Sequence, residues 1–174
     1  LGAAQERWPG LGGGARDWGH APKASLSLKP SALYSQAKPA APEDSARGIL
    51  GRLEPIYRQV AALGGALCLD MEQYRYKAII LEAYRRLRSH PDLRDHPHLW
   101  VVIQAYLRDS GQDLDELIAW ARREGLSLAI RLVKGAYWEY ENTVALQNGW
   151  ASPVWSHKAQ SDLNFERLAR RILE

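Results

Sequence analysis

The stretch SLAIRLVKGAYWEYE, residues 127–141, decides the fold that we predict for this chain. Its first half is a nearly continuous apolar run with β-branched residues, which favour a pleated backbone. Such a run is typical of a strand that is covered on both faces, as in the parallel sheets of α/β proteins. Arg131 and Lys134 interrupt the run, and a charge there is costly unless it is paired or faces a polar ligand.

Small residues and aromatic residues follow this strand directly. Gly135 and Ala136 leave room for a flat group to approach the backbone, and Tyr137 and Trp138 come next. Cations, a small-residue gap and aromatic rings at the C-terminal end of a strand are what a cofactor pocket in an α/β barrel requires. The same residues are also compatible with a buried strand whose charges pair with neighbouring strands.

The composition is that of an ordinary globular protein. The chain has 174 residues, of which 46% are hydrophobic and 25% charged, and its formal charge is +3. With 20 acidic and 23 basic residues and no basic block, the sequence gives no sign of a nucleic-acid partner. The single cysteine, Cys68, excludes a disulfide framework and fits a reducing compartment, so we expect a cytoplasmic protein. No apolar run approaches the ~20 residues that a membrane span needs, and no signal-peptide pattern is visible.

The sequence divides into two regions. Residues 1–23 are rich in Gly, Pro and Ala, but no strand pattern precedes the glycines at 10–14 and no helical pattern follows them. We therefore predict a flexible connector over residues 1–23 rather than a phosphate-binding loop. Residues 24–174 are predicted to form a barrel domain. Met71 is the only methionine and the last helical pattern runs to the final residues, so we expect a segment of a longer polypeptide, truncated at both ends.

From residue 24 onward, strand patterns alternate with helical patterns. Strands are predicted at residues 24–33, 66–71, 99–107 and 126–133. Helices are predicted at residues 43–63, 72–90 and 161–173, with another that ends at Glu124 and is capped by Asp113 or Asp115, and a loop at 144–154. This alternation implies an α/β fold with a parallel sheet and right-handed crossover connections.

Some features of the predicted helices and loops are expected to be structural only. Pro55 is expected to kink its helix or to begin a second segment. The three arginines among residues 85–88 are expected to face water. Three histidines between residues 90 and 98 flank prolines without matching Cys or acidic residues, so a polar turn is predicted there and no metal site.

Polar residues gather at the C-terminal ends of the four predicted strands. They are Lys29, Asp70, Gln104, Arg131 and Lys134. An amide such as that of Gln104 inside an apolar strand must find partners, either in the protein or on the edge of a flat heterocycle. Because the C-terminal ends of barrel strands carry the chemistry, these residues predict a site at one rim. The pattern does not by itself name a reaction.

Four segments together resemble flavin-dependent proline dehydrogenase, in particular the proline dehydrogenase domain of bacterial bifunctional proline utilisation proteins. The segments are LSLKPSALYSQ (residues 26–36), LCLDMEQYRYK (67–77), VVIQAYLRDSG (101–111) and RLVKGAYWEYE (131–141). They occur in the order and at the spacing of that family, and the resemblance covers about residue 24 to the end.

The resemblance implies a distorted (β/α)8 TIM-like barrel, of which this chain would contain about strands two to five of eight. It implies noncovalent FAD and oxidation of L-proline to 1-pyrroline-5-carboxylate, by hydride transfer from proline C5 to flavin N5. It also implies electron transfer to a quinone, peripheral contact with the inner face of the bacterial plasma membrane, and a fused or partner 1-pyrroline-5-carboxylate dehydrogenase. The chain alone is expected to be inactive, because the family's later strands and its paired carboxylate-binding arginines are missing.

The resemblance also assigns cofactor-binding roles. Arg131 matches an arginine near flavin N5, where a fixed cation stabilises charge that develops on the reduced flavin. Gln104 matches a glutamine that bonds the pyrimidine edge of the flavin. The remaining residues implied to line or pack against the flavin are Val102, Val133, Lys134, Gly135, Ala136 and Trp138.

Three residues are implied to act at the substrate end of the site. Lys29 matches a lysine that helps to hold the proline carboxylate, Asp70 an acid that orders neighbouring basic groups, and Tyr137 a residue that packs by the substrate ring. Two departures stand beside them: Pro30 replaces a common leucine, which would shift the backbone of Lys29, and Glu139 replaces a common aspartate.

Two other functions are compatible with the residues themselves. One is a barrel lyase that forms a Schiff base on Lys134 or Lys29, since a strand-end lysine in an apolar pocket can act as a nucleophile. The other is a non-catalytic barrel remnant, whose two open sheet edges would favour association with other chains.

Overall fold

The computed structural model describes residue 22 and residues 24–174, so the connector predicted over residues 1–23 lies outside the described residues apart from Pro22. Four strands form one sheet in the order β1-β2-β3-β4, and every neighbouring pair is parallel. They are β1 (Ser25–Leu28), β2 (Ala66–Leu69), β3 (Leu99–Gln104) and β4 (Ala129–Val133). The α/β alternation and the parallel sheet predicted from the sequence are confirmed.

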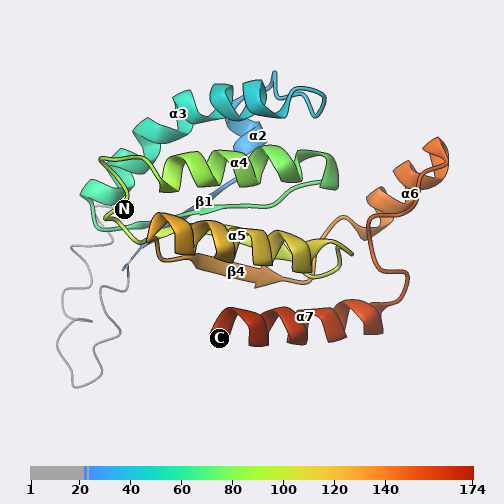
Figure 1. The fold of residues 1–174 in the computed structure, drawn as a ribbon. Helices are drawn as coiled ribbons and strands as arrows, with labels where there is room; N and C mark the ends of the chain where they lie inside the picture. Colours follow the sequence, from blue (N-terminus) through green and yellow to red (C-terminus); the bar gives the residue numbers. More distant parts are fainter. Residues whose placement is uncertain (1–21, 23) are drawn as a thin grey trace.

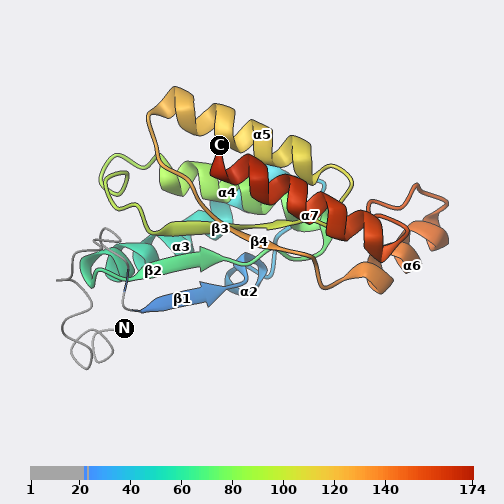
Figure 2. The same ribbon diagram turned by 90° about the horizontal axis from the view of Figure 1, so that it is seen from below.

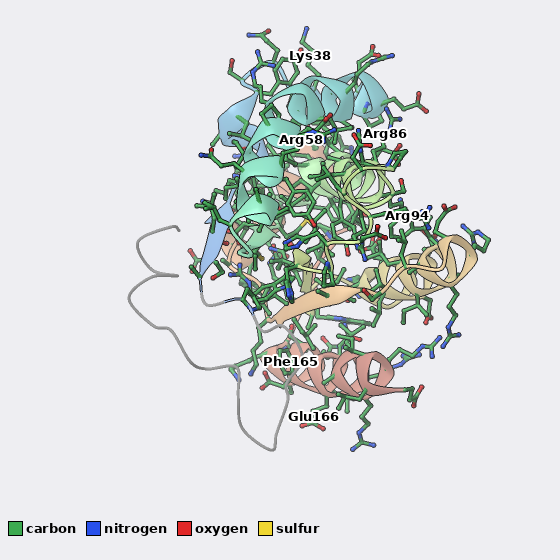
Figure 3. All side chains as sticks on the ribbon, turned by 90° about the vertical axis from the view of Figure 1, so that its left-hand side faces the viewer. Lys38, Arg58, Arg86, Arg94, Phe165 and Glu166 are labelled. Atoms are coloured by element: carbon green, nitrogen blue, oxygen red, sulfur yellow. The ribbon has the colours of Figure 1, made fainter. Side chains whose placement is uncertain are left out.

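Helices connect the strands, and most of them cover one face of the sheet, while the helix of residues 138–148 lies beyond the C-terminal ends of the strands (Figures 1 and 2). They are α2 (Pro30–Leu33), α3 (Pro42–Ala62), η1 (Tyr74–Tyr76), α4 (Lys77–Arg88), α5 (Ser110–Glu124), α6 (Trp138–Asn148) and α7 (Lys158–Leu173). Figure 3, a view along the sheet, shows α7 below β4, with Glu166 on the side of α7 that faces away from the sheet. Pro55 lies inside α3, which continues through it as one helix.

The core lies between the sheet and this helical layer. Leu69 and Val101 on the central strands are fully buried, as are Tyr57 of α3 and Tyr84 of α4. Fully burying an aliphatic or aromatic side chain stabilises the fold by about 1.5–3 kcal/mol. The rigid sheet that results holds the C-terminal ends of its strands in a fixed relation.

Several local predictions were wrong. Residues 30–33, predicted as strand, form α2, and Asp109 takes the N-cap position of α5 in place of Asp113 or Asp115. Part of the loop predicted at 144–154 belongs to α6, whose apolar residues do not gather on one face and so leave no helical pattern. The strand β4 is only partly buried because it forms an edge of the described sheet.

Arg88 is the clearest correction among the surface predictions. Its side chain is 2% exposed, whereas the sequence pattern predicted that it would face water. Its guanidinium donates to the backbone oxygen of Arg94 (2.6 Å) and to the backbone oxygen and the hydroxyl of Ser127 (3.3 and 3.2 Å). A buried cation needs such acceptors, and these come from loops that the helix itself does not contain.

Candidate functional site

The register of the sheet brings the predicted polar residues to one face. Leu69, Val101 and Ile130 are level with one another across β2, β3 and β4, and Val102 is level with Arg131. Asp70 follows Leu69 and is therefore level with Val102 and Arg131. Residues at one level of a parallel sheet point to the same face.

Gln104 reaches that face as well. It lies two residues beyond Val102 on β3, and alternate residues of a strand share a face. Gln104 is 3% exposed, and its Oε1 atom has no hydrogen-bond partner among the described residues. A buried amide oxygen without a partner is costly, so this atom is available to a donor that the described residues do not supply.

Asp70 and Arg131 form an ion pair at this rim. Arg131 Nη2 donates to Asp70 Oδ1, and Ser27 Oγ donates to the same oxygen at 2.6 Å. The Arg131 side chain is 45% exposed and that of Asp70 24%, so the pair is open on one side to solvent or to a ligand. Below it, burial raises the pKa of the Cys68 thiol, which is therefore a poor nucleophile.

The loop after β4 is shaped by a close backbone approach. Gly135 has a φ of +127°, and a Cβ atom built on it would lie 2.3 Å from Cδ1 of Tyr106. The backbone amides of Ala105 and Tyr106 donate to the carbonyls of Val133 (2.8 Å) and Lys134 (2.7 Å), which fixes the loop against the end of β3. A flat group does approach Gly135 closely, and it is the ring of Tyr106.

Tyr106 is a buried residue that the sequence patterns did not single out. It is 3% exposed, and its hydroxyl makes no regular hydrogen bond among the described residues. Burial, together with the nearby Glu141 carboxylate, raises the pKa of the Tyr106 hydroxyl, so it stays neutral. The ring of Tyr106 packs against the backbone of Gly135 and so supports the loop that follows β4.

Beyond Gly135 the chain forms an open hollow lined by residues 135–140. Ala136 and Trp138 are exposed there, and Tyr137 is half-buried at the N-cap of α6. The indole Nε1 of Trp138 donates to the carbonyl of Trp155 at 2.8 Å, and the residue remains 44% exposed. Exposed aromatic rings around small residues suit contact with a flat ligand.

Lys134 is directed away from this hollow, towards α7. Its ammonium donates to Asp162 Oδ1, and Lys158 donates to Asp162 Oδ2 at 2.6 Å. Hydrogen bonds from Lys134 and Lys158 lower the pKa of Asp162. Lys134 is also 52% exposed, so it lacks the apolar pocket in which a lysine becomes a nucleophile, and a Schiff-base role for it is not supported.

Lys29 stands at the C-terminal end of β1, as predicted. Its backbone is extended (φ −90°, ψ 118°), and it precedes Pro30, which is buried at the first position of α2. Pro30 thus sits where proline suits a helix start, and it leaves Lys29 at the end of the strand, level with Asp70. Lys29 is exposed, and Val133 completes the predicted set as a half-buried residue level with Gln104.

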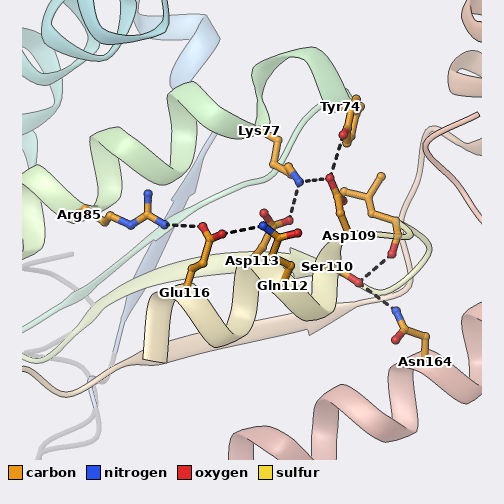
Figure 4. Close-up of polar contacts among 10 residues, drawn as sticks. Tyr74, Lys77, Arg85, Asp109, Ser110, Gln112, Asp113, Glu116 and Asn164 are labelled. Atoms are coloured by element: carbon orange, nitrogen blue, oxygen red, sulfur yellow. Dashed lines mark hydrogen bonds and ion pairs between the residues drawn. The ribbon is translucent and has the colours of Figure 1, made fainter. Parts of the chain in front are cut away.

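A second polar cluster lies beside this rim, where α4 and α5 begin (Figure 4). Lys77 donates to Asp109 (2.5 Å) and Asp113 (2.7 Å), and the Tyr74 hydroxyl donates to Asp109 at 2.8 Å. Burial raises the pKa of Asp113, and Lys77 opposes that shift. The backbone amide of Tyr74 donates to the buried carboxylate of Glu141 on α6 (2.7 Å), so the cluster links the loops after β2, β3 and β4.

Neither a metal-binding cluster nor a membrane-spanning helix is found among the described residues. Among residue 22 and residues 24–174 there is no group of three or more His, Cys, Asp or Glu side chains that could hold a metal ion. None of the helices described in the structure is both long enough and apolar enough to cross a membrane.

A parallel α/β sheet whose strand ends carry an ion pair, a buried amide and a small-residue loop defines a segment of a TIM-like barrel, with the candidate site at its C-terminal rim. The family is shown by comparison with known proteins. The chain belongs to the proline dehydrogenase family, whose model matches residues 1–174.

Individual relatives agree with this assignment. A crystal structure of proline utilization A (PutA) from Bdellovibrio bacteriovorus, inactivated by N-propargylglycine, has a TM-score of 0.92 and 40% identity, and the match covers 99% of this chain and 18% of that one. Bifunctional protein PutA from Rhizobium meliloti is 32% identical over 145 residues, covering 80% of this chain and 11% of its own length. Proline dehydrogenase 1, mitochondrial, from Arabidopsis thaliana is 30% identical and covers 76% of this chain and 29% of its own length. This chain therefore spans about a tenth of the curated PutA proteins.

Proposed function

We propose that the protein containing this chain oxidises L-proline to 1-pyrroline-5-carboxylate with noncovalently bound FAD. The observation that carries the proposal is the buried Oε1 of Gln104, which lacks a partner among the described residues and lies on the same sheet face as Arg131. Family membership supports the substrate and the reaction class. When bound, FAD would supply the acceptor for a hydride from proline C5 and a route for the two electrons to a quinone.

The residues of this chain would hold the flavin by complementary polar groups and by shape. Gln104 Oε1 would accept a hydrogen bond from an N–H on the pyrimidine edge of the isoalloxazine ring, which would satisfy an otherwise costly buried oxygen. Val102, Val133 and Ala136 would line the ring, and Trp138 would pack against the cofactor. Lys134 is turned towards Asp162, so its part would be limited to its backbone and stem.

Arg131 would act through its fixed charge. It lies in a strand and is held by Asp70, so its guanidinium is oriented before any ligand binds. A preoriented cation stabilises negative charge that develops close to it, without a reorganisation cost at the moment of reaction. Asp70 in turn would keep Arg131 from moving onto the substrate carboxylate.

Lys29 and Tyr137 would hold the substrate. A lysine ammonium at a strand end is suited to a carboxylate, and Tyr137 lies in the hollow next to the small-residue loop. The main contribution of such a site would be to bind proline in one orientation, because the reaction needs little acid–base catalysis by the protein.

The same proposal has consequences for the location of the protein, for the fate of its product and for the isolated chain. A quinone acceptor dissolves in the membrane, so we propose peripheral contact of the full protein with the inner face of the plasma membrane and an otherwise cytoplasmic location. The product would pass to a 1-pyrroline-5-carboxylate dehydrogenase, fused or separate. The isolated 174-residue chain would be inactive, because its described residues form one four-stranded sheet and do not close a barrel.

The test is a proline:dye oxidoreductase assay on the full-length protein, with anaerobic measurement of flavin reduction. We expect activity that depends on FAD, and a loss of about 100-fold in the reduction rate in Arg131→Met, as for removal of one charge-stabilising donor. An unchanged rate would remove Arg131 from its role. Proline turnover by the isolated chain would contradict the expected inactivity, and a borohydride-trapped adduct with a carbonyl substrate would favour the lyase instead.

A further inference from the structure

Glu72 is a buried carboxylate that neither the sequence patterns nor the proposed mechanism uses. It is 5% exposed and lies two residues after Asp70, in the loop that follows β2. Its Oε1 accepts a hydrogen bond from the backbone amide of Ser31 at 3.0 Å, and its Oε2 accepts one from the hydroxyl of the same residue. Both carboxylate oxygens are therefore committed to one residue, 41 positions away in the sequence.

Ser31 lies two residues after Lys29, at the start of α2. The N-cap residue of α2, Lys29, makes no side-chain capping bond. The amide of Ser31 lies in the first turn, where an amide has no acceptor within the helix and needs one from elsewhere. Glu72 supplies that acceptor from the loop after β2. The bond consequently fixes where the chain turns from β1 into α2.

Hydrogen bonds hold the backbone on both sides of Lys29. Before it, the Leu28 carbonyl accepts from the amide of Asp70 at 2.9 Å, which extends the pairing of β1 and β2 beyond the strands. After it, Ser31 is tied to Glu72. Two backbone ties, at positions 28 and 31, thus set the position of Lys29 relative to Asp70, while its own side chain stays exposed.

From this geometry we infer that Glu72 is a positioning residue for Lys29. It fixes the backbone of Lys29 relative to the Asp70–Arg131 pair, and so the point from which the Lys29 side chain reaches the carboxylate of an amino-acid substrate. The inference rests on the proposed function, because it takes Lys29 as the group that binds the substrate carboxylate. A merely structural Glu72 would stabilise the fold without a specific effect on substrate binding.

The experiment combines substitutions at Glu72 and Lys29 in the full-length protein. We expect Glu72→Ala to raise the KM for proline about tenfold with kcat nearly unchanged, the pattern of lost ground-state and transition-state binding alike. Glu72→Gln keeps an acceptor for the Ser31 amide and a donor for its hydroxyl, so its KM should stay within about threefold of the parent. Lys29→Met should raise KM on its own.

The decisive measurement is the double variant. If Glu72 acts through Lys29, adding Glu72→Ala to Lys29→Met raises KM no further, so the two effects are strongly non-additive. Additive effects on KM would overturn the inference, as would a Lys29→Met variant with an unchanged KM. If Glu72→Ala does not fold, the same comparison is made with Ser31→Ala, which removes the hydroxyl and leaves the amide.

A readout without turnover separates this inference from the proposed function. Amide hydrogen exchange at residues 31–33 should quicken in Glu72→Ala and stay close to the parent in Glu72→Gln. Unchanged exchange in Glu72→Ala would overturn the positioning role, whatever the enzyme does. A protein that shows no proline oxidation but the expected exchange pattern would instead contradict the proposed function and leave the Glu72–Ser31 contact established.

Discussion

Asp70 and Arg131 form an ion pair although their strands do not pair with each other. Asp70 follows β2 and Arg131 lies in β4, with β3 between them, and the side chains meet over Val102. The parallel register makes this contact possible because it places the three residues at one level and on one face. A charge on a strand, costly if left alone, is therefore satisfied while it remains accessible to a ligand.

The first prediction concerns Asp70. Asp70→Ala removes the acceptor of both Arg131 and Ser27, so the guanidinium is free to reorient. A hydrogen bond to a charged group is worth about 1.5–3 kcal/mol, and we expect flavin reduction by proline in the full-length protein to slow by about tenfold or more. Ser27→Ala is the matched control, because it removes one donor and leaves the ion pair. Equal effects of the two substitutions would contradict a role for the pair.

The second prediction separates cofactor binding from stability at Gln104. Gln104→Leu removes a buried oxygen that has no partner among the described residues, so the apoprotein should be as stable as the parent or more stable by about 1 kcal/mol. FAD affinity should fall at the same time if Gln104 bonds the flavin edge as proposed, since Leu offers no acceptor there. Thermal unfolding of the apoprotein and fluorescence titration with FAD measure the two effects. A destabilised apoprotein with unchanged FAD affinity would contradict the role proposed for Gln104.

Much of the fold could be predicted because it depends on local patterns. Apolar runs alternating with helical periodicity imply parallel βα units, and polar residues at the strand ends imply a common rim. For Asp70, Gln104 and Arg131 the sheet register confirms the shared face. Their chemical roles, and the extent of the barrel domain over residues 24–174, stay predictions.

The features that the sequence did not reveal depend on contacts between distant segments. Arg88 is buried because carbonyl groups from two loops surround it, and no helical pattern reports those loops. Gly135 was expected to make room for a ligand, whereas the ring of Tyr106 occupies the space against its backbone. Nothing in the sequence distinguishes Glu72 and Glu141 from surface acids. In the structure both are buried, and their carboxylates accept hydrogen bonds from the backbone amides of Ser31 and Tyr74.

The third prediction concerns the pH dependence of stability at the second polar cluster. The pKa of Asp113 is raised from 3.8 by burial, so the folded chain holds its proton to a higher pH than the unfolded chain does. The free energy of unfolding therefore loses a contribution as the pH rises from 3.8 through the raised pKa. In Lys77→Met the opposing cation is gone, so the pKa of Asp113 should rise further and this loss should extend to higher pH.

Urea unfolding at a series of pH values measures this effect. Asp113→Asn should flatten the pH dependence in that window, because the group no longer titrates. Adding Asp113→Asn to Lys77→Met should restore the flatter profile. A Lys77→Met profile parallel to that of the parent would mean that Lys77 and Asp113 are not coupled in solution, although the structure places Nζ 2.7 Å from the carboxylate.

The fourth prediction concerns Gly135, where backbone conformation and crowding act together. Gly135→Ala places a methyl group 2.3 Å from the ring of Tyr106 at a φ of +127°, so we expect a loss of about 3 kcal/mol of stability and displacement of the loop that carries Tyr137 and Trp138. Gly125→Ala is the matched control: its φ is +63° and nothing lies within 4 Å of the new Cβ, so its loss should be only about 1 kcal/mol. Thermal unfolding of the full-length protein measures both.

Tyr106→Ala should relieve the crowding but not the backbone strain, so the effect of Gly135→Ala in that background should fall towards the value for Gly125→Ala. If Gly135→Ala proves no more damaging than Gly125→Ala in the parent, the ring of Tyr106 does not hold this loop.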